Sequence, residues 1–188
     1  MNSKTILAGS WRSLAMTAVA AASMLVGSVT NAADQSFTYG YTGYGFDTAT
    51  DVYPAGEPDG FPVNITNAVG KGSGVKLVAI TAEFAPDLLG SVNCPDGYTV
   101  PFFLVYSSNV VTFADRSQTT GFSDNGWLCL TADLTAYVGA VEGFVTGGAG
   151  RFAGATGEFE STFDGMNIDP FFGFRTIRGE TRTTLWTK

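Results

Sequence analysis

Beyond residue 33, apolar and polar residues alternate over short runs, and the spacing expected of amphipathic helices is hard to find. In the run 156–163, Phe159 and Phe163 share one face, while Glu158 and Glu160 share the other. Gly, Asn, Asp and Pro cluster between the runs. The pattern predicts an all-β domain in which the two phenylalanines point inward and the two glutamates face solvent.

The runs predict a series of strands joined mostly by short turns. Their ranges are 36–46, 61–69, 75–84, 98–106, 109–114, 127–132, 137–146, 156–163, 171–178 and 180–187. Turns are expected at Ser107-Ser108 and at 123–126, and whether Gly179 turns the chain or lies inside one long strand is left open. Strands with short connections lie side by side, and about eight of them can close without an exposed edge. We therefore predict a single antiparallel up-and-down β-barrel of approximately eight strands.

The run 75–84 differs from the others because both of its alternating faces are apolar. Val78 and Ile80 lie on one face, and Leu77 and Ala79 lie on the other. This predicts a second layer over the strand, supplied either by another subunit in a homo-oligomer or by the segment before residue 70.

The first 32 residues have the three parts of a signal peptide. Lys4 and Arg12 form the positive region, an apolar run follows at 14–29, and small residues including Ala32 end the segment. The apolar run is shorter than the roughly 20 residues that a membrane-spanning helix needs, so no stable membrane insertion is expected. The sequence predicts a signal peptide at 1–32 and a secreted or periplasmic β-barrel domain at 33–188. Residues 33–70 are either an N-terminal extension or the first strands.

Cys94 and Cys129 are the only cysteines. In an exported chain, two cysteines are expected to be joined rather than free. We predict a structural disulfide between them.

Charge and composition exclude several functions. The net charge is −7 and becomes −9 when Lys4 and Arg12 leave with the signal, with 8 basic against 17 acidic residues, so a nucleic-acid partner is not expected. The chain has no histidine, which excludes His-based catalytic triads and His-ligated zinc. No cofactor is predicted.

The stretch 145–157, Val-Thr-Gly-Gly-Ala-Gly-Arg-Phe-Ala-Gly-Ala-Thr-Gly, resembles the strand–turn–strand of exported bacterial proteins with the allene oxide cyclase-like barrel, a fold similar to that of plant dirigent proteins. The segments 110–115 and 127–129 agree with it, and the resemblance covers about 75–186. It implies an eight-stranded antiparallel barrel, often oligomeric, whose interior can hold an apolar molecule. It does not carry an activity, because the functional residues of these families cannot be placed on this chain.

The matching turn is interpreted as scaffold. Gly147, Gly148 and Gly150 are expected to permit positive φ, and Gly154 and Gly157 to permit close approach of the next strand. Phe152 is expected to plug one end of the barrel. Arg151 is expected to hydrogen bond within the turn rather than to bind an anion.

Without histidine, proton transfer would fall to carboxylates or tyrosines. Glu83 and Glu142 are the candidates, because each alternates with mostly apolar residues along its strand. Either glutamate is a candidate catalytic residue if its side chain points into the lumen. The competing hypothesis, which we favour for both, places them in water at the barrel rim.

The densest acidic stretch comprises Asp47, Asp51, Glu57 and Asp59. Its spacing matches no established calcium loop, and prolines interrupt it, so no metal site is predicted. These acids are instead expected to pair with the basic C-terminal segment, because the first and last strands of a closed barrel are neighbours. The basic residues of that segment are Arg175, Arg178, Arg182 and Lys188.

We predict from these observations a binding protein that holds an apolar or aromatic small molecule in the barrel lumen. The expected lining residues are Phe102, Phe103, Tyr106, Phe113, Phe144, Phe159 and Phe163. Two alternatives stay open. One is an isomerase or cyclase that uses the same lumen with a buried glutamate, and the other is a structural or surface-interaction barrel whose core is filled by its own side chains. Whether the protein is an enzyme is left open.

Overall fold

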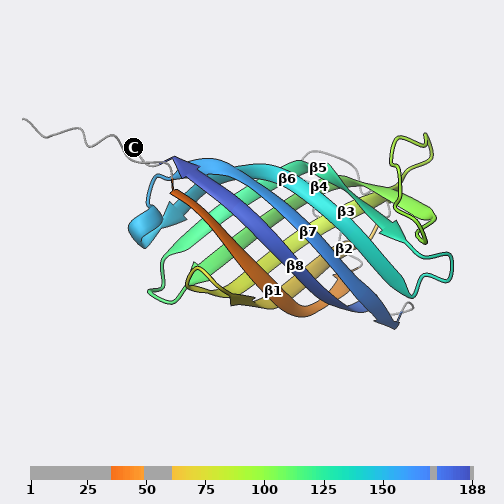
Figure 1. Ribbon diagram of the computed structural model, residues 1–188, viewed down its shortest axis with the longest axis horizontal. Coiled ribbons are helices and arrows are strands. Elements are labelled where there is room, and N and C mark those ends of the chain that lie inside the picture. Colours follow the sequence, from red (N-terminus) through yellow and green to blue (C-terminus); the bar gives the residue numbers. More distant parts are fainter. Residues whose placement is uncertain (1–34, 49–60, 170–172, 187–188) are drawn as a thin grey trace, which may run out of the picture.

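The computed structural model describes residues 35–48, 61–169 and 173–186, and these form one closed barrel of eight antiparallel strands (Figure 1). Each strand pairs with the next along the chain, and β1 pairs with β8 to close the barrel. The strands are β1 (Gln35–Thr48), β2 (Val63–Lys71), β3 (Val75–Pro86), β4 (Val100–Phe113), β5 (Gln118–Leu130), β6 (Ala136–Ala149), β7 (Thr156–Asp169) and β8 (Phe174–Trp186). The predicted fold class is confirmed.

Two of the predicted turns lie inside strands. The expected turn at Ser107-Ser108 lies inside β4, where Ser107 is buried and Ser108 pairs with Phe122. The segment 123–126 lies inside β5 and forms an irregularity, because the pairing with β6 jumps from Phe122 to Asn125. The small polar residues at these two places therefore do not reverse the chain. In β4 they put a serine on the inner face, and in β5 they form a bulge.

Gly179 lies within β8 and does not turn the chain. A Cβ atom at this position would overlap the ring of Tyr41, which reaches across from β1. Gly165 on β7 makes the same kind of room for the ring of Tyr137. These glycines face the interior and let large rings from neighbouring strands fill a narrow barrel.

One end of the barrel is closed by aromatic side chains. The short 3-10 turn η1 (Gly150–Phe152) carries Phe152, which is 3% exposed and lies 4.7 Å from Phe113 between ring centroids. Phe37 at the start of β1 lies 5.6 Å from Phe113. The predicted plug is therefore confirmed. Arg151 covers it from outside, with its guanidinium carbon 4.6 Å from the Phe152 ring centroid and Nη1 3.3 Å from Asp115.

The glycines of this turn do not all have the expected roles. Gly150 (φ 66°) and Gly154 (φ 75°) have positive φ, whereas Gly148 and Gly157 leave no room for a Cβ against neighbouring backbone. The predictions of positive φ at Gly147 and Gly148 and of close approach at Gly154 are wrong. The chain reverses at Gly150, so Gly147 and Gly148 are still part of the β6 strand.

The opposite end of the barrel carries the loop between β3 and β4 (residues 87–99), seen at the right of Figure 1. The predicted disulfide is present here, because Cys94 in this loop is bonded to Cys129 on β5 with Cα atoms 5.7 Å apart. This disulfide joins a long loop to the barrel wall.

The described residues leave part of the apolar outer face of β3 open, because residues 35–48 and 63–71 are themselves barrel strands. Leu77 is 57% exposed and pairs with Val69, which is 65% exposed. Glu83 on the same face is fully buried, so both expected covers, a second subunit and the segment before residue 70, stay predictions. The described part of the chain contains no helix of the length and apolarity that crossing a membrane requires.

Candidate ligand-binding lumen

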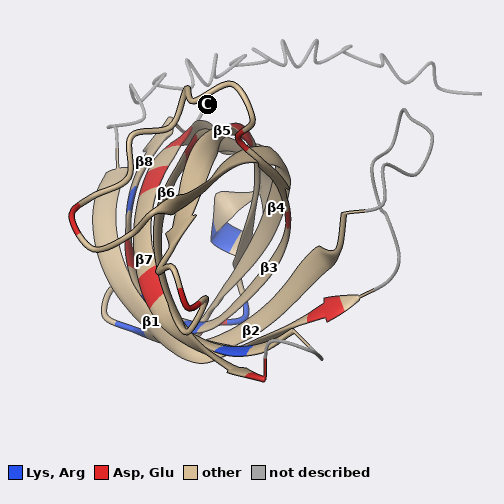
Figure 2. Ribbon diagram, turned by 90° about the vertical axis from the view of Figure 1, so that its right-hand side faces the viewer, with Lys and Arg blue, Asp and Glu red and all other residues tan. Residues whose placement is uncertain are grey.

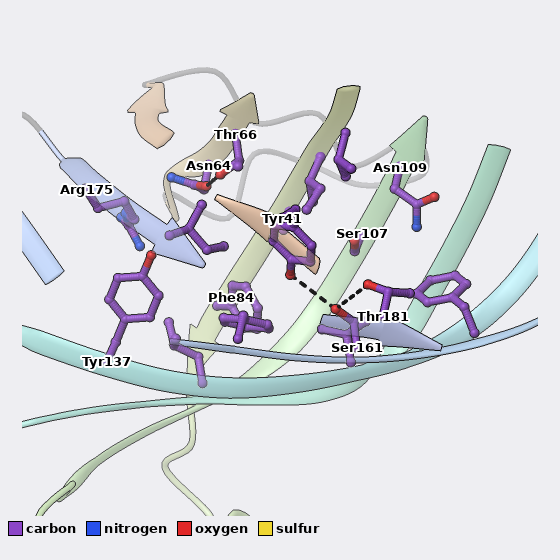
Figure 3. Close-up of a pocket in the computed structure, with 18 of the residues that line it drawn as sticks. Tyr41, Asn64, Thr66, Phe84, Ser107, Asn109, Tyr137, Ser161, Arg175 and Thr181 are labelled. Atoms are coloured by element: carbon purple, nitrogen blue, oxygen red, sulfur yellow. Dashed lines mark hydrogen bonds between the residues drawn. The ribbon is translucent and has the colours of Figure 1, made fainter. Parts of the chain in front are cut away.

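The barrel encloses an inner cavity of about 70 Å³. Its walls come from the inward positions of all eight strands, and Figure 3 shows the side chains around it. Most are apolar or aromatic, among them Val78, Ile80, Phe84, Val141, Phe159, Phe163 and Ile177. The inner cavity is therefore an apolar space with a few placed polar groups.

A second cavity of about 210 Å³ lies at the end of the barrel opposite the Phe152 plug. Residues from the ends of strands and from the adjoining loops line it, including Phe61, Phe102, Leu130 and Leu134. Five residues line both cavities and so mark their junction: Asn64, Ala82, Phe84, Leu128 and Arg175. Figure 2 looks into the barrel from this end. The two cavities adjoin at these residues, and the second one, at the end of the barrel away from the plug, is called the mouth cavity.

A cluster of hydroxyl groups lies deep in the inner cavity (Figure 3). Thr181 Oγ1 donates to Ser161 Oγ over 3.0 Å, and the Tyr41 hydroxyl lies 3.1 Å from the same oxygen. Burial raises the pKa of Tyr41 to about 12 and also raises the pKa of the neighbouring Tyr39. Both phenols are therefore neutral at physiological pH, which suits hydrogen bonding and not general-base catalysis.

Arg175 forms the charged part of the junction. Its Nη2 donates to both carboxylate oxygens of Asp47, and the Asn64 amide donates to Asp47 Oδ1 over 3.1 Å. The Arg175 guanidinium carbon lies 5.8 Å from the centroid of the Tyr137 ring, and burial raises the pKa of that tyrosine. A cation is thus held in the apolar lumen by one carboxylate and one aromatic face.

This ion pair confirms part of the predicted pairing between the acidic stretch and the C-terminal basic segment. Asp47 at the end of β1 meets Arg175 at the start of β8 because the two strands are neighbours. Arg178 pairs instead with Asp164 on β7, on the outside of the barrel. The predicted partners Asp51, Glu57, Asp59 and Lys188 lie outside the described residues.

The structure brings only part of the predicted aromatic lining to the lumen. Phe159 and Phe163 line the inner cavity, as the alternation in β7 predicted, and Phe102 lines the mouth cavity. Phe113 points inward but belongs to the plug at the closed end.

Phe103, Tyr106 and Phe144 lie on the outside of the barrel, so their placement in the lumen is wrong. Phe103 and Phe144 are 41% and 56% exposed, because each is next to a residue that points inward. For Tyr106 the cause is a bulge. The pairing of β3 with β4 skips Val105, which moves the inward positions of β4 from even to odd numbers.

Neither candidate glutamate lines the inner cavity. Glu83 is on the opposite face of β3 from Ala82 and Phe84, beside Val63 and Tyr106, and its side chain is fully buried. Both hypotheses for this residue are therefore wrong, since it faces neither the lumen nor water. Glu142 is exposed on the outer surface and accepts a hydrogen bond from the Asn125 amide, so its lumen role is also wrong. No Asp or Glu in the described ranges lines the inner cavity.

Sequence reasoning missed the polar residues of the lumen. Tyr39 and Tyr41 alternate with Phe37 along β1, so a period-two pattern was available for them. Arg175 and Asn64 had no such signal, because a charged or amide residue at the end of a strand usually faces water.

Comparisons with known proteins add little to this geometry. No family model matches the chain, and no curated protein matches it. Among solved structures, it is similar to the pterocarpan synthase dirigent protein, with 17% sequence identity over 82% of this chain and 87% of that chain and a TM-score of 0.34. At that identity and TM-score the similarity carries no argument about a ligand or a reaction, so function must be inferred from the residues of this chain.

Proposed function

We propose that this protein binds an apolar or aromatic small molecule in its lumen and that the molecule enters from the mouth. The observation that supports this most directly is the continuity of the two cavities through shared residues, with aromatic and aliphatic walls and one closed end. Concave, mostly apolar sites with a few polar groups are typical of small-molecule binding.

The size of the cavities indicates how such a ligand is held. An apolar cavity of about 150 Å³ accepts a benzene-sized molecule. The inner cavity, at about 70 Å³, is too small for a ring, whereas the mouth cavity, at about 210 Å³, has room for one. The ring therefore occupies the mouth, and a narrow substituent points through the junction towards the hydroxyl cluster.

The alternatives from the sequence are less well supported. A cyclase with a lumen glutamate lacks its residue, because Glu83 and Glu142 face away from the inner cavity. A barrel filled by its own side chains does not fit the open space at the mouth. Binding without a reaction is therefore the function that we propose. Export from the cytoplasm belongs to the same proposal, supported by the Cys94–Cys129 disulfide, while the expected signal peptide lies outside the described residues.

Ala82 offers a direct test because it is the smallest side chain at the junction. Ala82→Leu places three further carbon atoms in the passage between the cavities. We expect it to weaken binding of an apolar fluorescent naphthylamine by about tenfold or more, measured by fluorescence titration. Ala79→Leu is the matched control, since Ala79 is on the exposed face of the same strand, and its affinity is expected to equal that of the wild type.

If Ala82→Leu fails to fold, Ala82→Val makes a smaller obstruction at the same place. Equal affinity in a folded Ala82 variant and in Ala79→Leu would contradict binding in the lumen, and so would absence of binding to the wild type.

A further inference from the structure

We propose that Arg175 selects the ligand, and that among apolar molecules the site prefers an uncharged one with a carbonyl oxygen placed at the junction of the two cavities. This inference rests on the proposed function and adds the chemical class of the ligand. It follows from the hydrogen-bond donors of Arg175, from the charge of its surroundings, and from its position between the cavities.

The guanidinium of Arg175 has donors that the protein does not use. Asp47 accepts hydrogen bonds from Nη2 only. Nε is enclosed and has no hydrogen-bond partner among the described residues. Nη1 makes no hydrogen bond to the described part of the chain and is not enclosed as Nε is. An arginine with five N–H donors therefore presents an unused donor in the cavities that it lines.

The surroundings of this donor strengthen a hydrogen bond between it and a ligand. Arg175 is the one charged residue among the described residues that line the inner cavity, and its side chain is only 17% exposed. Hydrogen bonds to charged donors are stronger than neutral ones, and the low dielectric of an apolar cavity strengthens them further. An oxygen atom on an otherwise apolar ligand therefore finds its best partner at the junction.

The charge balance favours a neutral oxygen over a carboxylate. Asp47 already neutralises Arg175, and the Asn64 amide that supports Asp47 contributes no charge. The other polar groups of the inner cavity are phenols, hydroxyls and amides, which are also neutral. A ligand carboxylate would place a second negative charge beside Asp47 and leave the site with an uncompensated anion. A ketone or ester oxygen accepts the same hydrogen bond without that cost.

Three probes of nearly the same size separate these possibilities: butylbenzene, 4-phenyl-2-butanone and 3-phenylpropanoate. Their binding is measured by displacement of the fluorescent naphthylamine. For the wild type, we expect the ketone to bind about tenfold more tightly than the hydrocarbon, which is the change that about 1.4 kcal/mol produces. We expect the carboxylate to bind more weakly than the ketone.

The variant that tests Arg175 is the double substitution Asp47→Asn with Arg175→Met, which avoids leaving a buried carboxylate unpaired. We expect it to lose the preference for the ketone over butylbenzene. Asp164→Asn with Arg178→Met is the matched control, because it removes the exposed ion pair on the same strand, where the Arg178 side chain is 73% exposed. This control is expected to keep the preference.

The outcomes are distinct from those that test the proposed function. If none of the probes and no naphthylamine binds the wild type, the proposed function fails. If butylbenzene binds but the ketone has no advantage, if the carboxylate binds best, or if the ketone preference survives in the Asp47/Arg175 variant, the assignment of Arg175 is overturned while lumen binding stands. Should the double variant fail to fold, Arg175→Lys, which keeps the charge and loses the planar fork, is expected to reduce the preference. An unchanged preference in Arg175→Lys would then overturn the assignment.

Discussion

The two ends of the barrel use the same kinds of side chain for opposite purposes. At the closed end, Phe37, Phe113 and Phe152 pack ring against ring and leave the interior full. At the open end, Phe84 and Phe102 line a cavity of about 210 Å³ and leave it empty. Aromatic content alone therefore does not indicate a binding site.

What separates the ends is how the chain crosses them. A tight glycine turn inserts Phe152 into the barrel axis at one end. At the other end, a long loop is bonded to the barrel wall through the Cys94–Cys129 disulfide, and none of its residues 87–99 lines the cavity there. The difference between the ends predicts that substitutions at the plug affect stability and that substitutions at the mouth affect binding.

Removal of the plug has the largest expected effect. Phe152→Ala leaves a cavity among buried aromatic rings, and the expected loss is about 3–5 kcal/mol in the free energy of unfolding, measured by denaturant titration. Naphthylamine affinity of the folded variant is expected to stay within about twofold of the wild type. A stable variant with lost binding would reverse the roles that we assign to the two ends.

Gly150→Val tests how the plug is positioned. Gly150 has φ 66° and a Cβ there would lie 2.9 Å from Ser117 Cβ, so a β-branched residue is doubly unfavourable. The expected loss is about 1–3 kcal/mol in the free energy of unfolding. Gly147→Ala is the control in the same segment, because it has no positive φ and its nearest neighbour is the Thr120 hydroxyl at 3.4 Å. Equal losses in both variants would show that turn geometry does not position the plug.

The hydroxyl cluster between the two ends gives a smaller, pH-dependent effect. Burial raises the pKa of Tyr41 from 10.0 to about 12, so the folded state holds this proton when the unfolded state has lost it. The stability that this pKa shift contributes is therefore fully present below pH 10 and is lost as the pH rises from about 10 to 12. Between pH 8 and pH 10.5, we expect the free energy of unfolding of Tyr41→Phe to fall by about 1 kcal/mol less than that of the wild type. An identical pH dependence in both proteins would mean that Tyr41 is not buried as described.

The closed end could be predicted from sequence better than the mouth. The glycine turn and Phe152 are contiguous in the chain, so one short segment contains the information for the plug. Alternation also placed Phe159 and Phe163 correctly, because β7 has no bulge between them. Where the register slips, as at Val105, the same reasoning failed and put Tyr106 on the wrong face.

The mouth depends on contacts between residues that are far apart in the chain. Asp47 and Arg175 meet only because β1 and β8 close the barrel. Their pairing followed from the predicted topology, but their position over a cavity did not, since cavity shape depends on packing of many side chains at once. Glu83 shows the same limit. A period-two pattern can place this residue on the outer face, but it does not predict that the residue is buried there.

The most direct test of lumen binding is the position of a bound ligand, measured by NMR contacts between 4-phenyl-2-butanone and the protein side chains. We predict contacts from its ring to Phe84, Phe102 and Leu128 at the mouth. The barrel has another hollow on its outer surface, about 370 Å³ in volume, beside Tyr106 and Phe122. Ligand contacts with those two rings, and none with the mouth residues, would contradict the account.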